Sequence, residues 1–295
     1  MRAREFKLPA YFANRVAVYA ALILFALIFS LPFYWSILTS LRPNDQMFTQ
    51  QINFLPTNVT IEHYRKVFTT IPFWSYINNT AMITVLLMTT NIVFCTLAGY
   101  AFAKIDFVGK DLVYRIMMLS MMLPAAVLVV PQFLVIAKFP LLGGNNILGQ
   151  GGRGMVGSIW GVIAPTSVSI FNVFFIRQYY LATPNDIAES ARIDGAGELQ
   201  IFLRLYVPLA APAIATLAVF CFQSGWNSFL WPVIVLQSSN IKVITQGLAA
   251  FTFNNTTDYG PTMAASLIAT VPILIIYAFA QKYFVQGIAL TGMEE

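Results

Sequence analysis

Charged side chains are scarce in this sequence. Asp, Glu, Lys and Arg together make up 10% of its 295 residues, and apolar residues make up 58%. Soluble domains carry about 25% charged residues, enough to cover a surface exposed to water. The composition therefore argues against a soluble enzyme, a disordered scaffold or a DNA-binding module. We expect no nucleic-acid partner, in spite of the net charge of +5.

Reactive residues are equally sparse. The single histidine, His63, stands in a polar segment where we expect a surface residue, and Cys95 and Cys221 stand in apolar stretches typical of small buried side chains. The nearest match to the phosphate-binding pattern G-x-x-x-x-G-K-[ST] is residues 144–149, which Gln150 follows in place of Lys. No metal-ligand cluster or Ser/His/Asp set is visible. We therefore expect no enzyme activity, bound cofactor or metal, so any uphill transport would draw its energy from another subunit.

Long charge-free runs are what the sequence has instead. A helix needs about 20 residues to cross a ~30 Å hydrocarbon core, and six charge-free windows are long enough: 16–41, 67–103, 116–137, 154–176, 205–241 and 259–281. Backbone groups inside a bilayer must be satisfied within the segment, so we predict helices. We place these helices at about 16–39, 76–102, 115–137, 157–178, 207–231 and 263–283.

Basic residues in the short loops predict the orientation. Six spans put both termini on one side of the membrane, and that side carries eleven Lys and Arg residues against six on the other. We therefore predict a multi-pass protein of a cytoplasmic membrane, surrounded by lipid, with both termini in the cytoplasm. The opposite orientation would reverse every loop assignment.

Three segments then face outward: 42–74, the glycine-rich 139–157, which predicts turns without a core, and 232–261, which ends in the polar tip FNNTTDYGP. Each is either a plain connector or a docking surface for an extracytoplasmic partner, because binding residues concentrate in connecting loops.

The inner loop 181–207 is the most informative stretch. Thr183 is a favourable N-cap residue before Pro184, and Asp194-Gly195 predicts the stop of a helix that ends near Ile193. A second helix from about Glu198 places apolar residues on one face. An ordinary connection is a few residues long, so two short amphipathic helices at an angle indicate a protein-docking element.

Prolines and uncharged polar residues within the spans leave two readings open. Pro124 and Pro131 are either ordinary membrane-helix prolines or shape a pore-lining helix. Polar side chains either bond neighbouring helices or contact a hydroxylated solute. The candidates for a pore or substrate lining are Pro124, Gln132, Gln223 and Asn227.

The inner loop resembles the cytoplasmic signature of permease subunits of ABC importers, E-A-A, three residues, G, nine residues, I-x-L-P. Here it reads Glu189-Ser190-Ala191, then Gly195, then Leu205-Tyr206-Val207-Pro208 at the same spacing. Ser190, Leu205 and Val207 depart from the pattern but keep similar size or character. The segments ESARIDGAGELQIFLRLYVPLAAPA and FVQGIALTG resemble the carbohydrate branch of these permeases, in particular the smaller permease of maltose and glycerol-phosphate systems.

The resemblance implies an all-α polytopic membrane protein with six transmembrane helices and the type I ABC importer transmembrane fold. Residues 1–70 would hold the N-terminal tail, first span and an outer segment, 71–284 the transmembrane domain, and 285–295 a C-terminal cytoplasmic tail. The loop would dock on an ATPase subunit through Glu189, Ser190, Ala191, Arg192, Asp194, Gly195 and Pro208. The outer loop would reach a sugar-binding protein through Phe253, Asn254, Asn255, Asp258 and Tyr259.

The implied function is the translocation of a sugar or related polyol or oligosaccharide into a bacterium or archaeon. The implied partners are a second permease, a pair of ABC ATPase subunits that use the ATP, and an extracytoplasmic solute-binding protein. A stand-alone secondary transporter or channel is the alternative. It would need ionisable residues at depth or internal repeats, and we find neither in the sequence.

Overall fold

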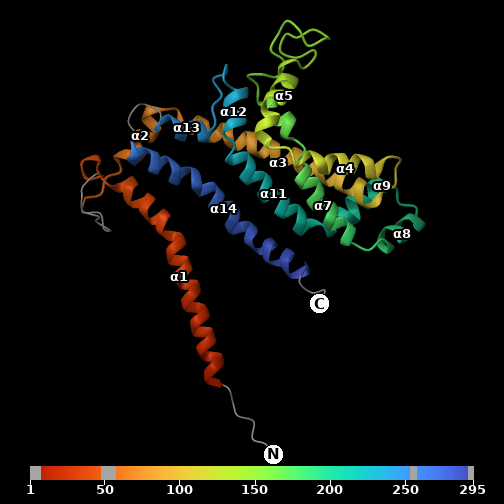
Figure 1. Cartoon of the computed structure of the whole chain (residues 1–295), viewed down its shortest axis with the longest axis horizontal. Helices are drawn as coiled ribbons and strands as arrows, with labels where there is room; N and C mark the ends of the chain where they lie inside the picture. Colours follow the sequence, from red (N-terminus) through yellow and green to blue (C-terminus); the bar gives the residue numbers. More distant parts are fainter. Residues whose placement is uncertain (1–7, 48–57, 253–257, 292–295) are drawn as a thin grey trace, which may run out of the picture. The chain divides into compact units, whose positions relative to one another are not determined.

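The computed structural model describes residues 8–47, 58–252 and 258–291, and the regular structure in these ranges is helical (Figure 1). The elements in chain order are α1 (Leu8–Leu41), η1 (Asn44–Gln46), α2 (Glu62–Thr70), α3 (Phe73–Lys104), α4 (Lys110–Ser120), α5 (Ala125–Ala137), α6 (Ile159–Ile163), η2 (Ala164–Thr166), α7 (Ile170–Ala182), α8 (Asp186–Ile193), α9 (Glu198–Ile201), the π-helical turn η3 (Phe202–Tyr206), α10 (Val207–Leu209), α11 (Ala211–Trp226), α12 (Leu230–Val235), α13 (Ile244–Ala250) and α14 (Tyr259–Thr291). The all-α prediction is confirmed.

The chain divides into two units. Unit 1 comprises residues 1–71 and 251–268, and unit 2 comprises residues 72–250 and 269–295, so α14 contributes to both. Unit 2 carries the predicted docking and pore residues and most of the helices, whereas Asp258 and Tyr259 of the predicted outer contact loop belong to unit 1.

Three helices are long and apolar enough to cross a membrane by themselves: α1, α3 and α14. Three further pairs of helices pass the same test together but are bent at a short break. If each bent pair forms one span, the described residues supply up to six spans, the number predicted from the sequence.

The bends correct the prediction of continuous helices at 115–137, 157–178 and 207–231. The axes turn by 112° between α4 and α5, by 44° between α6–η2 and α7, and by 79° between α9–α10 and α11. Figure 1 shows the first bend as the corner where α4 meets α5. Pro124 lies at this corner as the N-cap residue of α5. A proline lacks the N–H of the helical ladder and disfavours helical geometry in the residue before it, so the chain turns there.

The core of unit 2 is built on α3, which packs along α7 and α11. Small residues allow the close approach. A methyl group added at Gly99 of α3 would overlap the side chain of Ile176 on α7. Small residues at such contacts let membrane helices pack by van der Waals interaction, because lipid provides no hydrophobic force between them.

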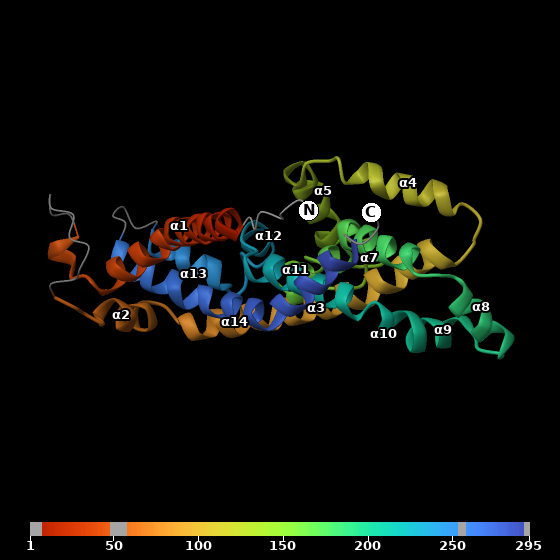
Figure 2. The same cartoon turned by 90° about the horizontal axis from the view of Figure 1, so that it is seen from below.

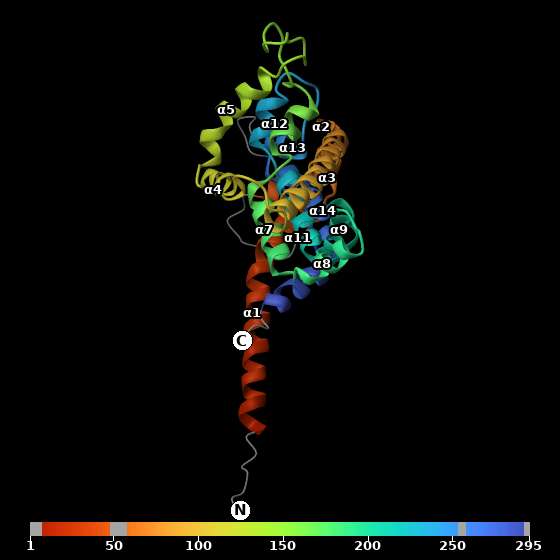
Figure 3. The same ribbon diagram turned by 90° about the vertical axis from the view of Figure 1, so that its right-hand side faces the viewer.

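The glycine-rich loop 139–157 follows α5, and Figure 3 shows it at the end of unit 2 away from α8. The predicted turns are present, and the buried side chain of Asn145 takes the place of a core. Its Nδ2 donates to the carbonyl oxygens of Ala137 (2.9 Å) and Phe139 (3.0 Å), and its Oδ1 accepts from the Gly152 N–H (2.8 Å). One amide therefore closes the loop onto the end of α5.

His63 in unit 1 corrects a prediction. The sequence indicated a surface residue, but the ring is 4% exposed and its Nε2 lies 2.8 Å from the carbonyl oxygen of Arg42. Gly260, at the start of α14, lies against the ring so closely that a methyl group there would overlap it. A polar group can be buried when it is hydrogen-bonded, and the sequence around His63 does not reveal the partner.

Candidate functional site

The predicted docking element forms a helix–turn–helix, here called the α8–α9 hairpin (residues 183–206). Figure 2 shows α8, α9 and α10 gathered at one end of unit 2. Helix α8 ends at Ile193, and Gly195 follows in the left-handed region with φ of +83°. The N–H of Ala196 reaches back to the carbonyl oxygen of Ala191 (2.9 Å), as in glycine-terminated helices. The predicted stop at Asp194-Gly195 is confirmed.

The predicted N-cap of this helix is wrong. Thr183 is the C-cap residue of α7, and its hydroxyl donates to the Tyr179 carbonyl oxygen (3.2 Å). Helix α8 begins later, at Asp186. The Nζ of Lys104 on α3 donates to the Thr183 carbonyl oxygen (2.6 Å) and to Asn185 Oδ1 (2.5 Å), which ties this connection to α3 before α8 starts.

The second arm of the hairpin carries the predicted apolar face. Ile201 and Phe202 are buried, and Leu205 is half-buried and packs against the same core. The arm passes from the α-helical turn of α9 into the π-helical turn η3. Such turns are rare and frequently occur at functional sites.

The candidate docking residues are accessible. Glu189, Ser190, Arg192, Asp194, Gly195 and Pro208 are exposed, and Ala191 is half-buried. Between the two arms lies a cleft of about 450 Å³, lined by Ala191, Asp194, Gly195, Ala196, Gln200, Ile201, Arg204 and Leu205. Beside it Ile193 is 86% exposed and Leu199 is 65% exposed. The hairpin therefore exposes charged and apolar groups together, a composition that suits contact with another protein.

An ion pair joins the two arms. Arg192 Nε on α8 donates to Glu198 Oε1 on α9 (2.7 Å), and the Tyr100 hydroxyl on α3 donates to Glu198 Oε2 (2.8 Å). These two donors, Arg192 first, hold the pKa of the Glu198 carboxyl below its usual range. Glu198 is not among the site residues predicted from the sequence.

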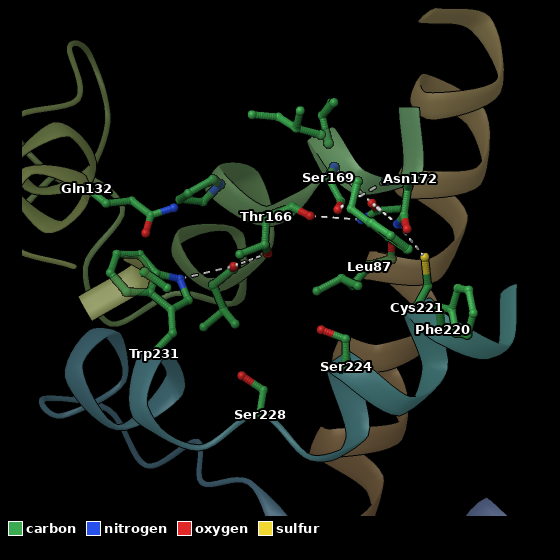
Figure 4. Close-up of a pocket in the computed structure, with 18 of the residues that line it drawn as sticks. Leu87, Gln132, Thr166, Ser169, Asn172, Phe220, Cys221, Ser224, Ser228 and Trp231 are labelled. Atoms are coloured by element: carbon green, nitrogen blue, oxygen red, sulfur yellow. Dashed lines mark hydrogen bonds between the residues drawn. The ribbon is translucent and has the colours of Figure 1, made fainter. Parts of the chain in front are cut away.

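The second candidate region is a cavity of about 630 Å³ within unit 2 (Figure 4). Its walls come from α3, α5, α7, α11 and α12 and from the break between η2 and α7. The polar residues that line it are Asn91, Gln132, Thr166, Ser169, Asn172, Ser224 and Ser228, beside the aromatic Phe171, Phe220 and Trp231. Ligand pockets of about 300–1,000 Å³ with a few polar groups among apolar walls are typical of small-molecule sites.

Asn91 holds the wall of this cavity together at the break before α7. Its Nδ2 donates to the Thr166 carbonyl oxygen (2.8 Å), and its Oδ1 accepts from the Ser169 N–H (3.2 Å) and from Asn172 Nδ2 (3.1 Å). Without Asn91, the Thr166 carbonyl and the Ser169 N–H would lack an intrahelical partner, because the helix is broken between them. A polar side chain from a neighbouring helix satisfies such groups in a membrane protein.

Both cysteines lie beside this network, free and buried as predicted. Asn172 Nδ2 lies 3.2 Å from Cys221 Sγ, and the Cys95 thiol donates to Asn91 Oδ1 (3.6 Å). In the part of the chain that the structure describes, no group of three or more His, Cys, Asp or Glu side chains is placed to hold a metal ion.

Only one of the four predicted pore residues lines this cavity. Gln132 lines it, whereas Pro124 caps α5 and the exposed Gln223 and Asn227 are not part of the lining. Ser224 and Ser228 line it instead. Since successive residues of a helix point about 100° apart, Ser224 lies on a different face of α11 from Gln223, and Ser228 follows the end of that helix. The role of these polar residues in a pore stays a prediction.

The predicted outer contact loop is described only in part. Phe253, Asn254 and Asn255 lie outside the described residues. Asp258 accepts a hydrogen bond from Lys66 within unit 1, and the exposed Tyr259 begins α14. Contact of this loop with a binding protein stays a prediction.

The hairpin and the cavity occur in a fold with known relatives. Residues 92–290 match the family described as binding-protein-dependent transport system inner membrane component. The chain is 30% identical, over 88% of each sequence, to the arabinooligosaccharides transport system permease protein AraQ of Halalkalibacterium halodurans.

Two solved structures have a similar fold. One, titled as a bacterial ABC transporter involved in the import of the acidic polysaccharide alginate, matches with a TM-score of 0.73 over 96% of this chain and 100% of that chain, at 24% identity. The other, the bacterial alginate ABC transporter in complex with alginate pentasaccharide-bound periplasmic protein, matches with a TM-score of 0.64 over 90% and 93%, at 18% identity. With the family match over two thirds of its length, this chain belongs to the inner-membrane components of binding-protein-dependent transport systems.

Proposed function

We propose that this chain is one of two permease subunits of an ABC importer that carries an oligosaccharide or related polyol across the cytoplasmic membrane. The family supports a membrane-embedded transport subunit that depends on a binding protein. The named relatives support a carbohydrate: one transports arabinooligosaccharides, and the structural neighbours transport alginate.

The observation that carries the proposal is the α8–α9 hairpin. Its first helix is stopped by a left-handed glycine, its second arm is anchored through Ile201 and Phe202, and its signature residues are exposed. An element anchored on one face and accessible on the other is suited to docking. Its partner would be one subunit of an ABC ATPase pair, and Glu189 would meet basic groups of the docking groove. The ATP would be bound there, because this sequence has no phosphate-binding motif of its own.

The cavity supports passage of a hydroxylated solute through the permease. Amide and hydroxyl groups from Gln132, Ser224 and Ser228 offer hydrogen bonds, and Trp231 and Phe220 offer aromatic surface. A sugar ring has both hydroxyl groups and apolar faces, so it matches this mixture of polar and aromatic groups. The second permease would complete the path.

The orientation belongs to the same proposal. The hairpin and both termini would be cytoplasmic, and the glycine-rich loop 139–157 and the segment 232–261 would face a sugar-loaded binding protein. ATP-driven closure of the two ATPase subunits would then move the permease helices between inward-facing and outward-facing states.

The test is an affinity purification of the full chain from its native membranes in mild detergent, with mass spectrometry of the proteins that accompany it. We expect a second permease and an ATPase with a Walker A motif. The binding protein encoded or purified with them would be screened with an oligosaccharide panel by thermal shift, and the sugar that stabilises it would be the probe for ATP-dependent uptake into liposomes. A chain that purified alone and catalysed solute flux without ATP would overturn the proposal in favour of a stand-alone transporter.

A further inference from the structure

The carboxylate of Glu198 joins three helices. It accepts one hydrogen bond from Arg192 on α8 and another from Tyr100 on α3, at 2.7 and 2.8 Å, while Glu198 itself belongs to α9. The two oxygens serve different elements: Oε1 holds the arms of the hairpin together, and Oε2 holds the hairpin to α3. Hydrogen bonds to an ionised group are shorter and stronger than neutral ones.

The tyrosine in this arrangement stands out from its neighbours. Three tyrosine rings pack together, with centroids 5.1 Å apart for Tyr100 and Tyr206, 5.7 Å for Tyr180 and Tyr206, and 6.0 Å for Tyr100 and Tyr180. All three residues are buried. The hydroxyls of Tyr180 and Tyr206 have no hydrogen-bond partner among the described residues, whereas the Tyr100 hydroxyl reaches Glu198. Packing alone would serve all three rings equally, so the Tyr100 hydroxyl has a directional role.

Helix α3 connects this point to the cavity. Leu87 and Asn91 line the cavity from α3, and Tyr100 follows Asn91 by nine residues on the same unbroken helix. At 1.5 Å per residue, the two side chains are separated by about 14 Å along the axis. One turn beyond Tyr100, Lys104 holds the beginning of the hairpin through Thr183 and Asn185. The last two turns of α3 therefore hold both arms of the hairpin.

We propose that Glu198 is a positioning residue that transmits displacement of the hairpin to α3 through Tyr100, and so couples ATPase closure to the shape of the cavity. This inference rests on the proposed function. An exposed hairpin that was not tied to a span could follow its ATPase without moving the cavity wall. The Glu198–Tyr100 hydrogen bond adds a directional link between α9 and α3 to the packing of Phe202 against Tyr100, and Arg192 extends this link to α8.

The test uses the whole transporter, purified with its partners and reconstituted with the binding protein and the sugar identified by thermal shift. The variants are Glu198→Gln, Glu198→Ala and Tyr100→Phe, and the matched controls are Tyr180→Phe and Tyr206→Phe, which remove neighbouring hydroxyls that have no described partner. Sugar uptake and ATP hydrolysis are measured on the same preparations. Their ratio separates coupling from folding, because a poorly folded complex loses both activities together.

We expect Tyr100→Phe and Glu198→Ala to lower the sugar transported per ATP hydrolysed about tenfold, the effect of losing one hydrogen bond to a charged group, with complex assembly and ATP hydrolysis retained. Glu198→Gln should fall between these variants and the wild type, since its amide oxygen still accepts from Tyr100. The double variant Tyr100→Phe/Glu198→Ala should be no worse than Glu198→Ala, because Glu198→Ala already removes the acceptor of the Tyr100 hydroxyl. The two control variants should keep the wild-type ratio.

Two results would overturn the inference. A wild-type ratio in Tyr100→Phe and Glu198→Ala would show that the contact transmits nothing, and an equal loss in Tyr180→Phe would show that the cluster matters only through packing. Both results require a wild-type complex that takes up sugar with ATP. If the wild type itself shows no such uptake, the proposed function fails first, so the two failures are distinguishable.

Discussion

The two candidate regions of unit 2 are held together by different forces. The α8–α9 hairpin uses charges at its exposed end: Arg192 and Glu198 bridge its arms with side chains that are 42% and 46% exposed. The cavity uses neutral amides, with Asn91 and Asn172 bonded to each other and to backbone groups at the break before α7. Water solvates the charges of the hairpin, whereas a charge in the cavity wall would carry a large desolvation cost. The chemistry of each region follows the solvent around it.

The largest effect should come from the hairpin. Gly195→Val places a β-branched residue at φ of +83°, where only glycine is unstrained, and Glu189→Lys reverses an exposed charge at the proposed docking face. Either change should abolish ATP-dependent sugar uptake and leave membrane insertion intact, as measured by uptake and immunoblotting on the same vesicles. Gly197→Ala is the control for the first variant, since Gly197 has φ of −75° and open space around it. Wild-type uptake in both variants would remove the docking assignment.

The next effect should come from the amide network. Asn91→Leu leaves the Thr166 carbonyl and the Ser169 N–H without their side-chain partner, and we expect a loss of about 3 kcal/mol in stability from these buried groups. Thermal unfolding of the protein in detergent measures it. Asn78 lies exposed on the same helix, so Asn78→Leu should leave the thermal stability unchanged. Equal stability of the two variants would contradict the claim that amides hold the cavity wall.

A smaller effect should come from filling the cavity. Ser224→Trp projects a large ring into the space beside Phe220 and Ser228, and we expect uptake to fall about tenfold as the pocket volume is lost. Gln223→Trp, one residue earlier and outside the lining, should keep most of the uptake. Equal loss in both variants would indicate that α11 tolerates no bulk on either face, and the cavity would not be the path.

The smallest effect should come from a charge pair outside both regions in which the acidic partner is fully exposed. Lys110 Nζ lies 3.2 Å from Asp106 Oδ1, and the Asp106 side chain is fully exposed. Asp106→Asn should change thermal stability less than Asn91→Leu does, because water screens the charge of a fully exposed carboxylate. A larger loss in thermal unfolding would show that charges at the surface of unit 2 stabilise it more than the comparison of hairpin and cavity implies.

The hairpin could be predicted from the sequence because its signals are local. Asp194-Gly195 ends α8 wherever the helix lies, and the apolar residues after Glu198 mark a buried face by their spacing alone. The start of α8 could not be predicted in the same way. Thr183 has the chemistry of an N-cap, but Lys104, 79 residues earlier, holds its carbonyl group at the end of α7. A distant contact overrides the local preference.

The cavity was predicted less well because it is assembled from distant residues. Apolar windows identify the spans but not which face of each span lines the cavity. The sequence therefore predicts Gln223 and Asn227, whereas Ser224 and Ser228 line the cavity. The sequence leaves Pro124 as either an ordinary membrane-helix proline or part of a pore-lining helix, and only the folded chain shows that it lies at a corner of 112°. Serine is too common in helices to mark a cavity without the positions of the neighbouring helices.

The hydrogen bonds made by the Asn91 side-chain amide affect how long a solute stays in the cavity. Its Nδ2 and Oδ1 are already engaged by Thr166, Ser169 and Asn172, so this amide has little capacity left for a sugar. A solute in this cavity would instead meet the Gln132 amide, the hydroxyls of Ser224 and Ser228 and the aromatic rings, a smaller set of hydrogen-bonding groups. Affinity differences are expressed chiefly in the dissociation rate, so the dwell time within this subunit should be brief. Such a wall favours turnover over retention and leaves selection of the cargo to other parts of the transporter.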